Sequence, residues 1–134
     1  MPVMSEAART LFATAIGEAE QTALLLDSGG KPLAGSYIDQ RGRDISVEIG
    51  VALSGVGTEV TRSMRLLSIG RWTAVVVETD AATIALAPAT EDAVVLLASS
   101  LAVPLGLVRR VLTRSVALAI NWMRGRAGRH WLRS

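Results

Sequence analysis

Apolar residues recur with two different periods along the chain, and each change of period marks a new element. From Ser5 to about Glu20 they recur at helical spacing, with Ser5 as a candidate N-cap. Residues 22–26 and 33–38 are short apolar runs of strand type, separated by turn residues at 27–32. The first third of the chain therefore predicts a short amphipathic helix followed by a β-hairpin.

The middle of the chain, residues 44–69, is helical again and carries two neighbouring stripes. The first is the expected core face and consists of Ile49, Leu53, Val56, Val60, Met64 and Leu67. The second consists of small residues, Gly50, Ser54, Gly57 and Thr61. A glycine inside a helix costs about 1 kcal/mol relative to alanine. The second stripe therefore predicts close approach of another backbone, or else glycines with no packing role.

The last part of the chain predicts three strands and a helix. Gly70 is suited to end the central helix, and the strands are expected at 72–78, 83–88 and 93–98, with short polar turns between them. Residues 105–123 have one apolar and one arginine-bearing face, as an amphipathic helix has. The complete order is helix, two strands, helix, three strands, helix, with the three strands forming an antiparallel meander.

Composition limits the chemistry that this α+β chain can perform. Its 134 residues suit one domain, half of them are apolar and 4% are aromatic, so the core must be aliphatic. The absence of cysteine excludes disulfides, thiolate metal sites and a cysteine nucleophile, and His130 is the single histidine. The N-terminal segment lacks the pattern of a secretory signal, so we expect a cytoplasmic protein.

Charge divides the chain into two parts. Residues 1–92 hold seven basic and twelve acidic residues, a net charge of −5, whereas residues 93–134 hold seven arginines and no acid, a net charge of +7. Within this chain we expect a domain at 1–118 and a basic extension at 119–134, which contains Trp122 and Trp131. The extension suits an anionic membrane surface or an acidic protein, and nucleic acid is the least favoured partner. The alternative is a disordered, solubilising tail.

The sequence DSGGKP at 27–32 resembles a phosphate-binding loop only superficially. That loop requires a glycine five positions before the second one, a hydroxyl after the lysine and a helix next, whereas this chain has Leu25, Pro32 and a strand. His130 lies in the extension, and the adjacent acids Glu91 and Asp92 suit a turn between strands. We predict no catalytic residue, no metal site and no cofactor, and hence a protein that is not an enzyme.

Four segments in this order resemble the Roadblock (dynein light-chain) family, in particular its bacterial GTPase-regulator type. LLLDSGGKPLAGS resembles the first hairpin of the family, ISVEIGVALSGVGTEV its central helix, WTAVVVETDAATIALAPATEDAVVLLAS its three-stranded meander and PLGLVRRVL its closing helix. The similarity extends over about residues 5–115. It implies a five-stranded antiparallel sheet sandwiched between helices, with the central helix on one face and the terminal helices on the other, an architecture also described as profilin-like.

The resemblance also implies a homodimer in which the third strands pair edge to edge and the central helices lie together. The residues implied at that interface are Gly50, Ser54, Gly57, Thr61, Trp72, Ala74 and Val76. Members of the family regulate or support small Ras-like GTPases, so the resemblance implies a GTPase-activating or scaffolding partner. The implied contact residues are Glu59, Arg62 and Arg65. The alternative is that these three only form a solvent-exposed helix face without a partner.

Three functional interpretations remain open at this stage. The first is the homodimeric GTPase regulator or platform, in which an arginine either stabilises transition-state charge directly or helps to position the residues of the GTPase. The second is a dimeric structural or membrane-proximal scaffold that does not bind a GTPase. The third is a small-ligand sensor on a related sandwich fold, for which the sequence shows no cluster of buried polar residues.

Overall fold

The computed structural model describes residues 4–17 and 21–133, and for residues 127–133 only the backbone. The order of elements confirms the predicted one. It consists of α1 (Glu6–Arg9), α2 (Ala13–Ile16), β1 (Gln21–Asp27), β2 (Pro32–Gly35), α3 (Ser46–Ala52), α4 (Val56–Leu67), β3 (Val75–Glu78), β4 (Ala82–Thr90), β5 (Ala93–Ser100) and α5 (Leu105–Arg133).

Several predicted boundaries are wrong. The N-terminal helix is divided into α1 and α2, and the predicted end at residues 18–20 lies outside the described residues. The central helix is divided into α3 and α4. The last helix continues to Arg133 instead of ending at Met123. The basic extension at 119–134 begins within this helix, and its separate role stays a prediction. The side chains of His130 and Trp131 lie outside the described residues.

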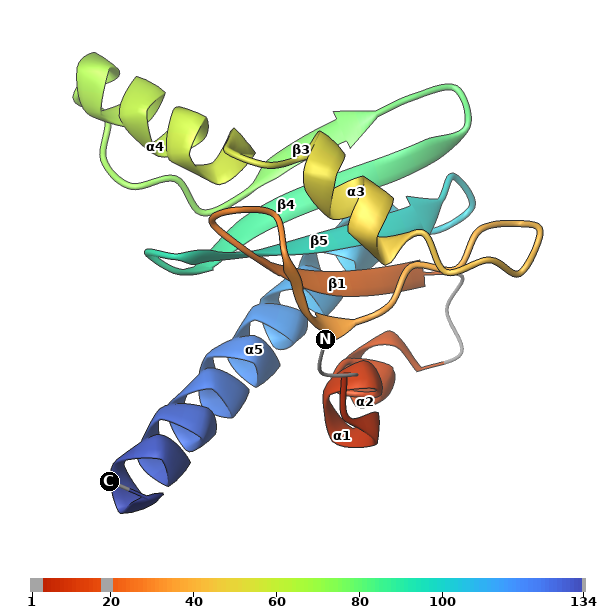
Figure 1. Cartoon of the computed structure of the whole chain (residues 1–134). Helices are drawn as coiled ribbons and strands as arrows, with labels where there is room; N and C mark the ends of the chain where they lie inside the picture. The colour runs from red at the N-terminus through yellow and green to blue at the C-terminus, as the bar shows by residue number, and fades with distance from the viewer. Residues whose placement is uncertain (1–3, 18–20, 134) are drawn as a thin grey trace.

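The five strands form one antiparallel sheet in the order β2-β1-β5-β4-β3. Helices α3 and α4 lie over one face of this sheet, and α1, α2 and α5 lie over the other, as Figure 1 shows. The predicted fold class, an α+β sandwich with a five-stranded antiparallel sheet between helices, is therefore confirmed.

Each face of the sheet has its own core because alternate side chains of a strand point to opposite faces. On the α5 face, the buried side chains include Leu25, Val95 and Leu97, together with residues of α1 and α5. On the α3–α4 face, the buried side chains are the four leucines Leu24, Leu26, Leu86 and Leu96. The predicted aliphatic core thus consists of a larger and a smaller cluster.

Two five-residue turns have the same hydrogen-bond pattern. In the β1–β2 turn, Asp27 Oδ1 accepts the backbone N–H of Gly29 at 2.9 Å and that of Lys31 at 2.8 Å. In the second turn, Asp39 Oδ1 accepts the N–H groups of Arg41 and Arg43, both at 2.9 Å. The fourth residue of each is a glycine with positive φ, 85° in the first turn and 79° in the second. The segment DSGGKP is therefore a tight turn that leads into β2, with Lys31 exposed.

Helix α5 extends well past the sheet. Its first half lies beneath β4 and β5, and the helix then continues beyond the other elements towards the C-terminus (Figure 1). Among the described residues, no helix, α5 included, combines the length and the apolarity that crossing a bilayer requires.

Candidate interaction surface

The layer formed by α3 and α4 contains a break at its centre. Leu53, Ser54 and Gly55 separate the two helices, and Gly55 has a φ of 83°, in the left-handed region that glycine favours. The pattern of apolar residues is helical on both sides of the break and therefore gave no sign of it. The conformation of Gly55 accordingly explains why a single helix over 44–69 is wrong.

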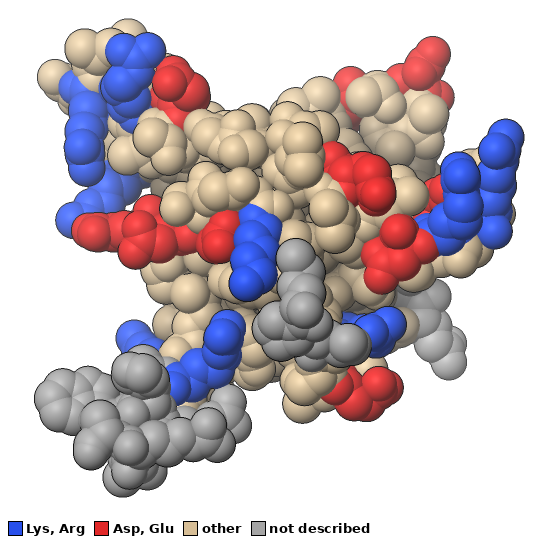
Figure 2. Space-filling view, in the orientation of Figure 1, with Lys and Arg blue, Asp and Glu red and all other residues tan. Residues whose placement is uncertain are grey.

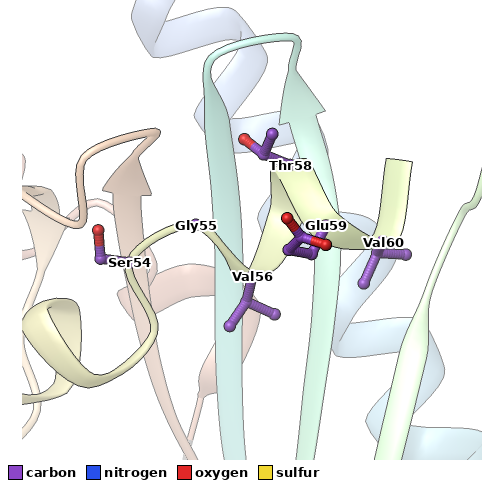
Figure 3. Close-up of a pocket in the computed structure, with 6 residues that line it drawn as sticks. All are labelled: Ser54, Gly55, Val56, Thr58, Glu59 and Val60. Carbon is purple, nitrogen blue, oxygen red and sulfur yellow. The ribbon is translucent and has the colours of Figure 1, made fainter. Parts of the chain in front are cut away.

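A shallow hollow of about 520 Å³ lies beside the break. Figure 3 shows that Val56 and Val60 point to one side of α4 and that Thr58 points to the other. The hollow is lined by Ser54, Gly55, Val56, Thr58, Glu59 and Val60. Two of its side chains are aliphatic and one is acidic, so the lining suits contact with a protein surface better than enclosure of a small ligand.

The stripe of small residues packs against the chain's own hairpin and sheet. Gly50 lies so close to Gly30 that a Cβ atom on either residue would overlap the carbonyl oxygen of the other. The Ser54 hydroxyl donates to the carbonyl oxygen of Gly29 at 3.2 Å. A Cβ on Gly57 would lie 2.6 Å from Val94 Cγ2 on β5. The close approach of another backbone is thus found within one chain.

The last member of the stripe, Thr61, holds the segment after α4. Its hydroxyl oxygen accepts the indole N–H of Trp72 at 2.9 Å, and the hydroxyl donates to the carbonyl of Gly57 at 2.9 Å. Gly50, Ser54, Gly57, Thr61 and Trp72 therefore all make contacts within the chain. Their additional role between two chains stays a prediction.

The apolar stripe is only half covered. Ile49, Leu53 and Val56 pack on the four leucines of the sheet, as predicted. Within α4, which lies wholly in the described part of the chain, no residue is buried. Leu67, which was expected in the core, is 62% exposed. The reason is that α4 extends past the edge of the sheet, so no strand lies beneath its last turn (Figure 1).

Exposed aliphatic side chains lie on α3, on α4 and directly after α4. Val47 and Val51, one turn apart on α3, are 62% and 71% exposed, and Leu66 and Ile69 are 76% and 67% exposed. These four residues were not predicted as candidates for partner contact. The signal was present for Val47 and Val51, because their spacing places them together on the side of α3 that the core stripe leaves free.

Strand β3 forms one edge of the sheet and pairs with β4 along its whole length. Its other side has no strand partner among the described residues. The predicted strand 72–78 begins only at Val75, so Ala74 lies before it and is exposed. Val76 packs on the α5-face core and Val77 is 50% exposed. An aliphatic edge strand with free N–H and C=O groups is suited to pairing with another chain.

The three charged residues predicted to bind a partner lie together on the exposed side of α4. Arg62 Nη2 lies 3.2 Å from Glu59 Oε2, and both side chains are about two-thirds exposed (67% and 66%). Such an exposed pair contributes at most about 1 kcal/mol, so a partner can displace it. Arg65 follows one turn from Arg62 and is also exposed. In the described residues, no three His, Cys, Asp or Glu side chains are grouped as metal ligands would be.

Asp44 and Ser46 connect the start of α3 with the segment that follows β2 through hydrogen bonds. Its Oδ1 accepts the backbone N–H of Ser46 at 3.0 Å and the Ser46 hydroxyl at 2.5 Å. The Ser46 oxygen in turn accepts the N–H of Tyr37 at 2.8 Å. The hydrogen bonds from Ser46 hold the pKa of the Asp44 carboxyl below its usual value.

Comparison with solved structures identifies the fold. The structure of MglB from Myxococcus xanthus superposes with a TM-score of 0.73 at 13% identity and covers 90% of this chain and 97% of that one. A Roadblock/LC7 domain from Streptomyces avermitilis has a TM-score of 0.72 at 15% identity, with coverages of 87% and 97%. The gliding protein MglB from Thermus thermophilus has a TM-score of 0.69 at 20% identity, with coverages of 89% and 93%.

These similarities confirm that the chain has the Roadblock fold in the form seen in bacterial MglB. A profilin from Acanthamoeba castellanii also matches, with a lower TM-score of 0.53 at 14% identity. No protein family is matched by the sequence itself. No curated protein is matched by it either. The similarity to these proteins is therefore found in the backbone structure, and the resemblance inferred from the sequence is confirmed at the level of the fold.

Proposed function

We propose that this Roadblock-fold chain is a homodimeric, non-enzymatic regulator or platform for a small Ras-like GTPase, acting in the cytoplasm. The observation that carries the proposal is the open α3–α4 face, on which α4 has no buried residue, together with the β3 edge, which has no strand partner among the described residues. Solved structures with this fold include bacterial MglB, one of them described as having a tetrameric arrangement, with a TM-score of 0.67 at 22% identity.

The dimer is proposed to form through β3 and the adjacent α4. Pairing of two β3 edges in antiparallel register would continue the sheet from one copy into the next and satisfy the free backbone groups. It would also bring the half-covered α4 helices next to each other, where Leu66 and Ile69 can lose contact with water. The geometry is self-complementary, as a twofold dimer requires.

Light scattering at tens of micromolar tests the dimer. The expected mass is twice the 14.1 kDa of one chain. Val77→Glu would place an added acid beside Glu78, so two paired edges would bring like charges together and the variant should be monomeric. Val47→Glu on α3 adds the same charge away from the edge and is the matched control. A wild-type mass of one chain contradicts the dimer.

The GTPase is proposed to bind the outer side of α3 and α4. Val47 and Val51 supply exposed aliphatic area there, and Glu59, Arg62 and Arg65 supply charges of both signs that select for a complementary surface. An arginine of this group either enters the nucleotide site of the GTPase or helps to position residues of the GTPase itself. Both modes use the same surface.

The test measures binding and single-turnover hydrolysis with Ras-like GTPases of the organism that encodes the chain, loaded with GDP or a GTP analogue. We expect preferential binding to one nucleotide state. If Arg62 or Arg65 acts on the transferred phosphate, its replacement by alanine should lower the stimulated rate about a thousandfold or more while binding is retained. If the arginines only position the partner, the rate should fall in proportion to affinity.

Two results decide against the GTPase. Absence of binding to both nucleotide states by a folded dimer contradicts the regulator and leaves the dimeric scaffold. Unchanged affinity in Val51→Asp, with Leu107→Asp on α5 as the matched control of equal charge, contradicts the proposed surface even if a GTPase binds.

A further inference from the structure

Helix α5 presents a solvent face whose charges are all positive. Its inner face is buried against the sheet through Val108, Val111, Leu112, Ser115 and Ala119. The charged residues of α5 are arginines, and every one whose side chain is described is exposed. Arg109, Arg110, Arg114 and Arg124 lie outside the inner face, whereas Arg126, seven residues after Ala119, lies on the line of the inner face beyond the sheet. In Figure 2, the part of α5 seen below the sheet accordingly shows blue and no red.

These arginines have no acidic neighbours along the chain. The sequence contains no Asp or Glu between residues 93 and 134. The two ion pairs among the described residues, Arg43–Asp39 and Arg62–Glu59, both lie outside α5. Arg126 instead lies over the ring of Trp122, 4.7 Å from the ring centre. Like charges along one helix repel one another, so an anionic surface would stabilise the whole row.

An exposed aliphatic corner adjoins the N-terminal end of this row. Leu101, in the turn after β5, is 51% exposed, and Leu105 and Leu107, in the first turn of α5, are 42% and 37% exposed. Arg109 and Arg110 follow directly. A surface that combines leucines with arginines is typical of helices that lie at the interface of an anionic bilayer, where apolar side chains enter the acyl boundary and cations meet the headgroups.

We propose that the solvent face of α5 and the corner formed by Leu101, Leu105 and Leu107 bind the surface of an anionic lipid bilayer. Charge complementarity selects an anionic partner, and the leucines favour lipid over nucleic acid, which would neutralise the arginines but leave the leucines in water. The helix lies on the bilayer and does not cross it.

The position of α5 in the fold gives this contact a defined orientation. The sheet separates α5 from α3 and α4, so a domain resting on α5 turns the α3–α4 face away from the bilayer (Figure 1). A partner on α3–α4 and the membrane on α5 can then be bound together. The lipid contact does not depend on the identity of that partner, and its failure would leave the GTPase proposal intact.

The experiment is co-sedimentation of the full-length protein with vesicles of phosphatidylcholine alone or with 30% phosphatidylglycerol. We expect binding to the anionic vesicles only, and weaker binding as salt is raised, because the Debye length shortens. Each basic residue near an anionic surface contributes about a fivefold factor in partitioning. Replacing Arg109, Arg110 and Arg114 together by glutamine should therefore weaken binding roughly a hundredfold.

The matched control replaces Arg62, Arg65 and Arg71 by glutamine, which removes the same net charge from the opposite face of the sheet. The proposal is overturned if the two triple variants lose binding equally, because the contact would then follow net charge alone. It is also overturned if wild-type protein binds neutral and anionic vesicles equally or binds neither. Circular dichroism establishes that both variants are folded.

A second variant tests the aliphatic corner at constant charge. Leu101→Ser with Leu105→Ser should weaken vesicle binding severalfold. Lipids that carry a quencher should reduce the fluorescence of Leu105→Trp more than that of the wild type, which already contains three tryptophans. A parallel titration uses a 30-base-pair DNA duplex as the anionic probe. Tight, α5-dependent binding to the duplex combined with weak vesicle binding would overturn the lipid assignment in favour of nucleic acid.

Discussion

The helices cover the two faces of the sheet to different extents. On the α5 face, one long helix and the short α1 and α2 cover the strands and bury most of the core. On the α3–α4 face, four leucines form the core and α4 contributes no buried residue to it. The α5 face is therefore packed as a domain core is, whereas the α3–α4 face leaves aliphatic side chains exposed to solvent.

This difference places most of the buried core and the proposed protein contacts on opposite faces of the sheet. Buried aliphatic area is the main source of folding free energy, and most of it lies on the α5 face. Exposed aliphatic side chains cost little in folding but are available for association, and those of α3 and α4 gather on the other face. Substitution of exposed aliphatic residues on α3 and α4 should accordingly affect association more than unfolding.

The largest expected contrast comes from leucines on the two faces. Leu97→Ala removes a fully buried side chain and should lower the free energy of unfolding by about 2–5 kcal/mol. In the Val77→Glu background, which prevents the proposed dimer, Leu66→Ala at a residue that is 76% exposed on α4 should change it by less than about 0.5 kcal/mol. Urea unfolding followed by circular dichroism measures both. Equal losses would refute the assignment of stability to the α5 face.

Glycines on the two faces provide the next contrast. Gly50→Ala would force a methyl group into the carbonyl of Gly30 and should destabilise the protein by about 1–3 kcal/mol. Gly106 on α5 faces open space within the described structure, so Gly106→Ala should stabilise it by up to about 1 kcal/mol. Thermal unfolding distinguishes the two. A neutral Gly50→Ala would mean that α3 is not held against the hairpin.

The hydrogen bond between Trp72 and Thr61 should have a smaller effect. Trp72→Phe keeps an aromatic ring but removes the N–H donor, at a cost of about 1 kcal/mol. A double-mutant cycle with Thr61→Ala measures the coupling between the two side chains. Additive losses would show that this bond does not hold α4 to the segment that leads into β3.

The smallest effect is expected from Asp44 and depends on pH. Because hydrogen bonds from Ser46 lower the pKa of Asp44 in the folded state, its contribution is present above the unfolded pKa and is lost as pH falls through the folded pKa. Asp44→Asn should therefore be less stable than wild type at pH 7, by a few tenths of a kcal/mol, and the difference should shrink below about pH 4. Unfolding measured between pH 7 and pH 3 tests this. A difference that is constant over this range would contradict it.

The sequence predicted the order of elements and the fold because hydrophobic period and turn residues are local signals. The hairpin at Asp27–Lys31 is an example, since its hydrogen bonds lie within five residues. The break at Gly55 was missed because the apolar residues keep helical spacing across it. The exposure of Leu67 was missed for a different reason, since it depends on where the sheet ends beneath α4.

The candidate surface was predicted only in outline. The exposure of Glu59, Arg62 and Arg65 could be predicted because their side of the helix is polar, and their contact with a partner stays a prediction. Gly50 and Gly57 were predicted at a contact between two chains. The structure places them against Gly30 and Val94 of the same chain, and their role between two chains stays a prediction. A stripe of small residues indicates that something comes close, but not whether it belongs to the same chain. Only the three-dimensional arrangement could make that distinction.

The position of β1 in the sheet has a consequence for synthesis on the ribosome. β1 pairs with β5, so that Leu24 lies opposite Leu96, about 70 residues later in the chain. At ribosomal rates of roughly 5–20 residues per second, the hairpin of β1 and β2 has to wait about 4–14 s for its neighbour. During this interval the backbone groups of residues 23–26 that face β5 have no strand partner. We therefore expect a ribosome-associated chaperone to have its largest effect at the stage of the nascent hairpin.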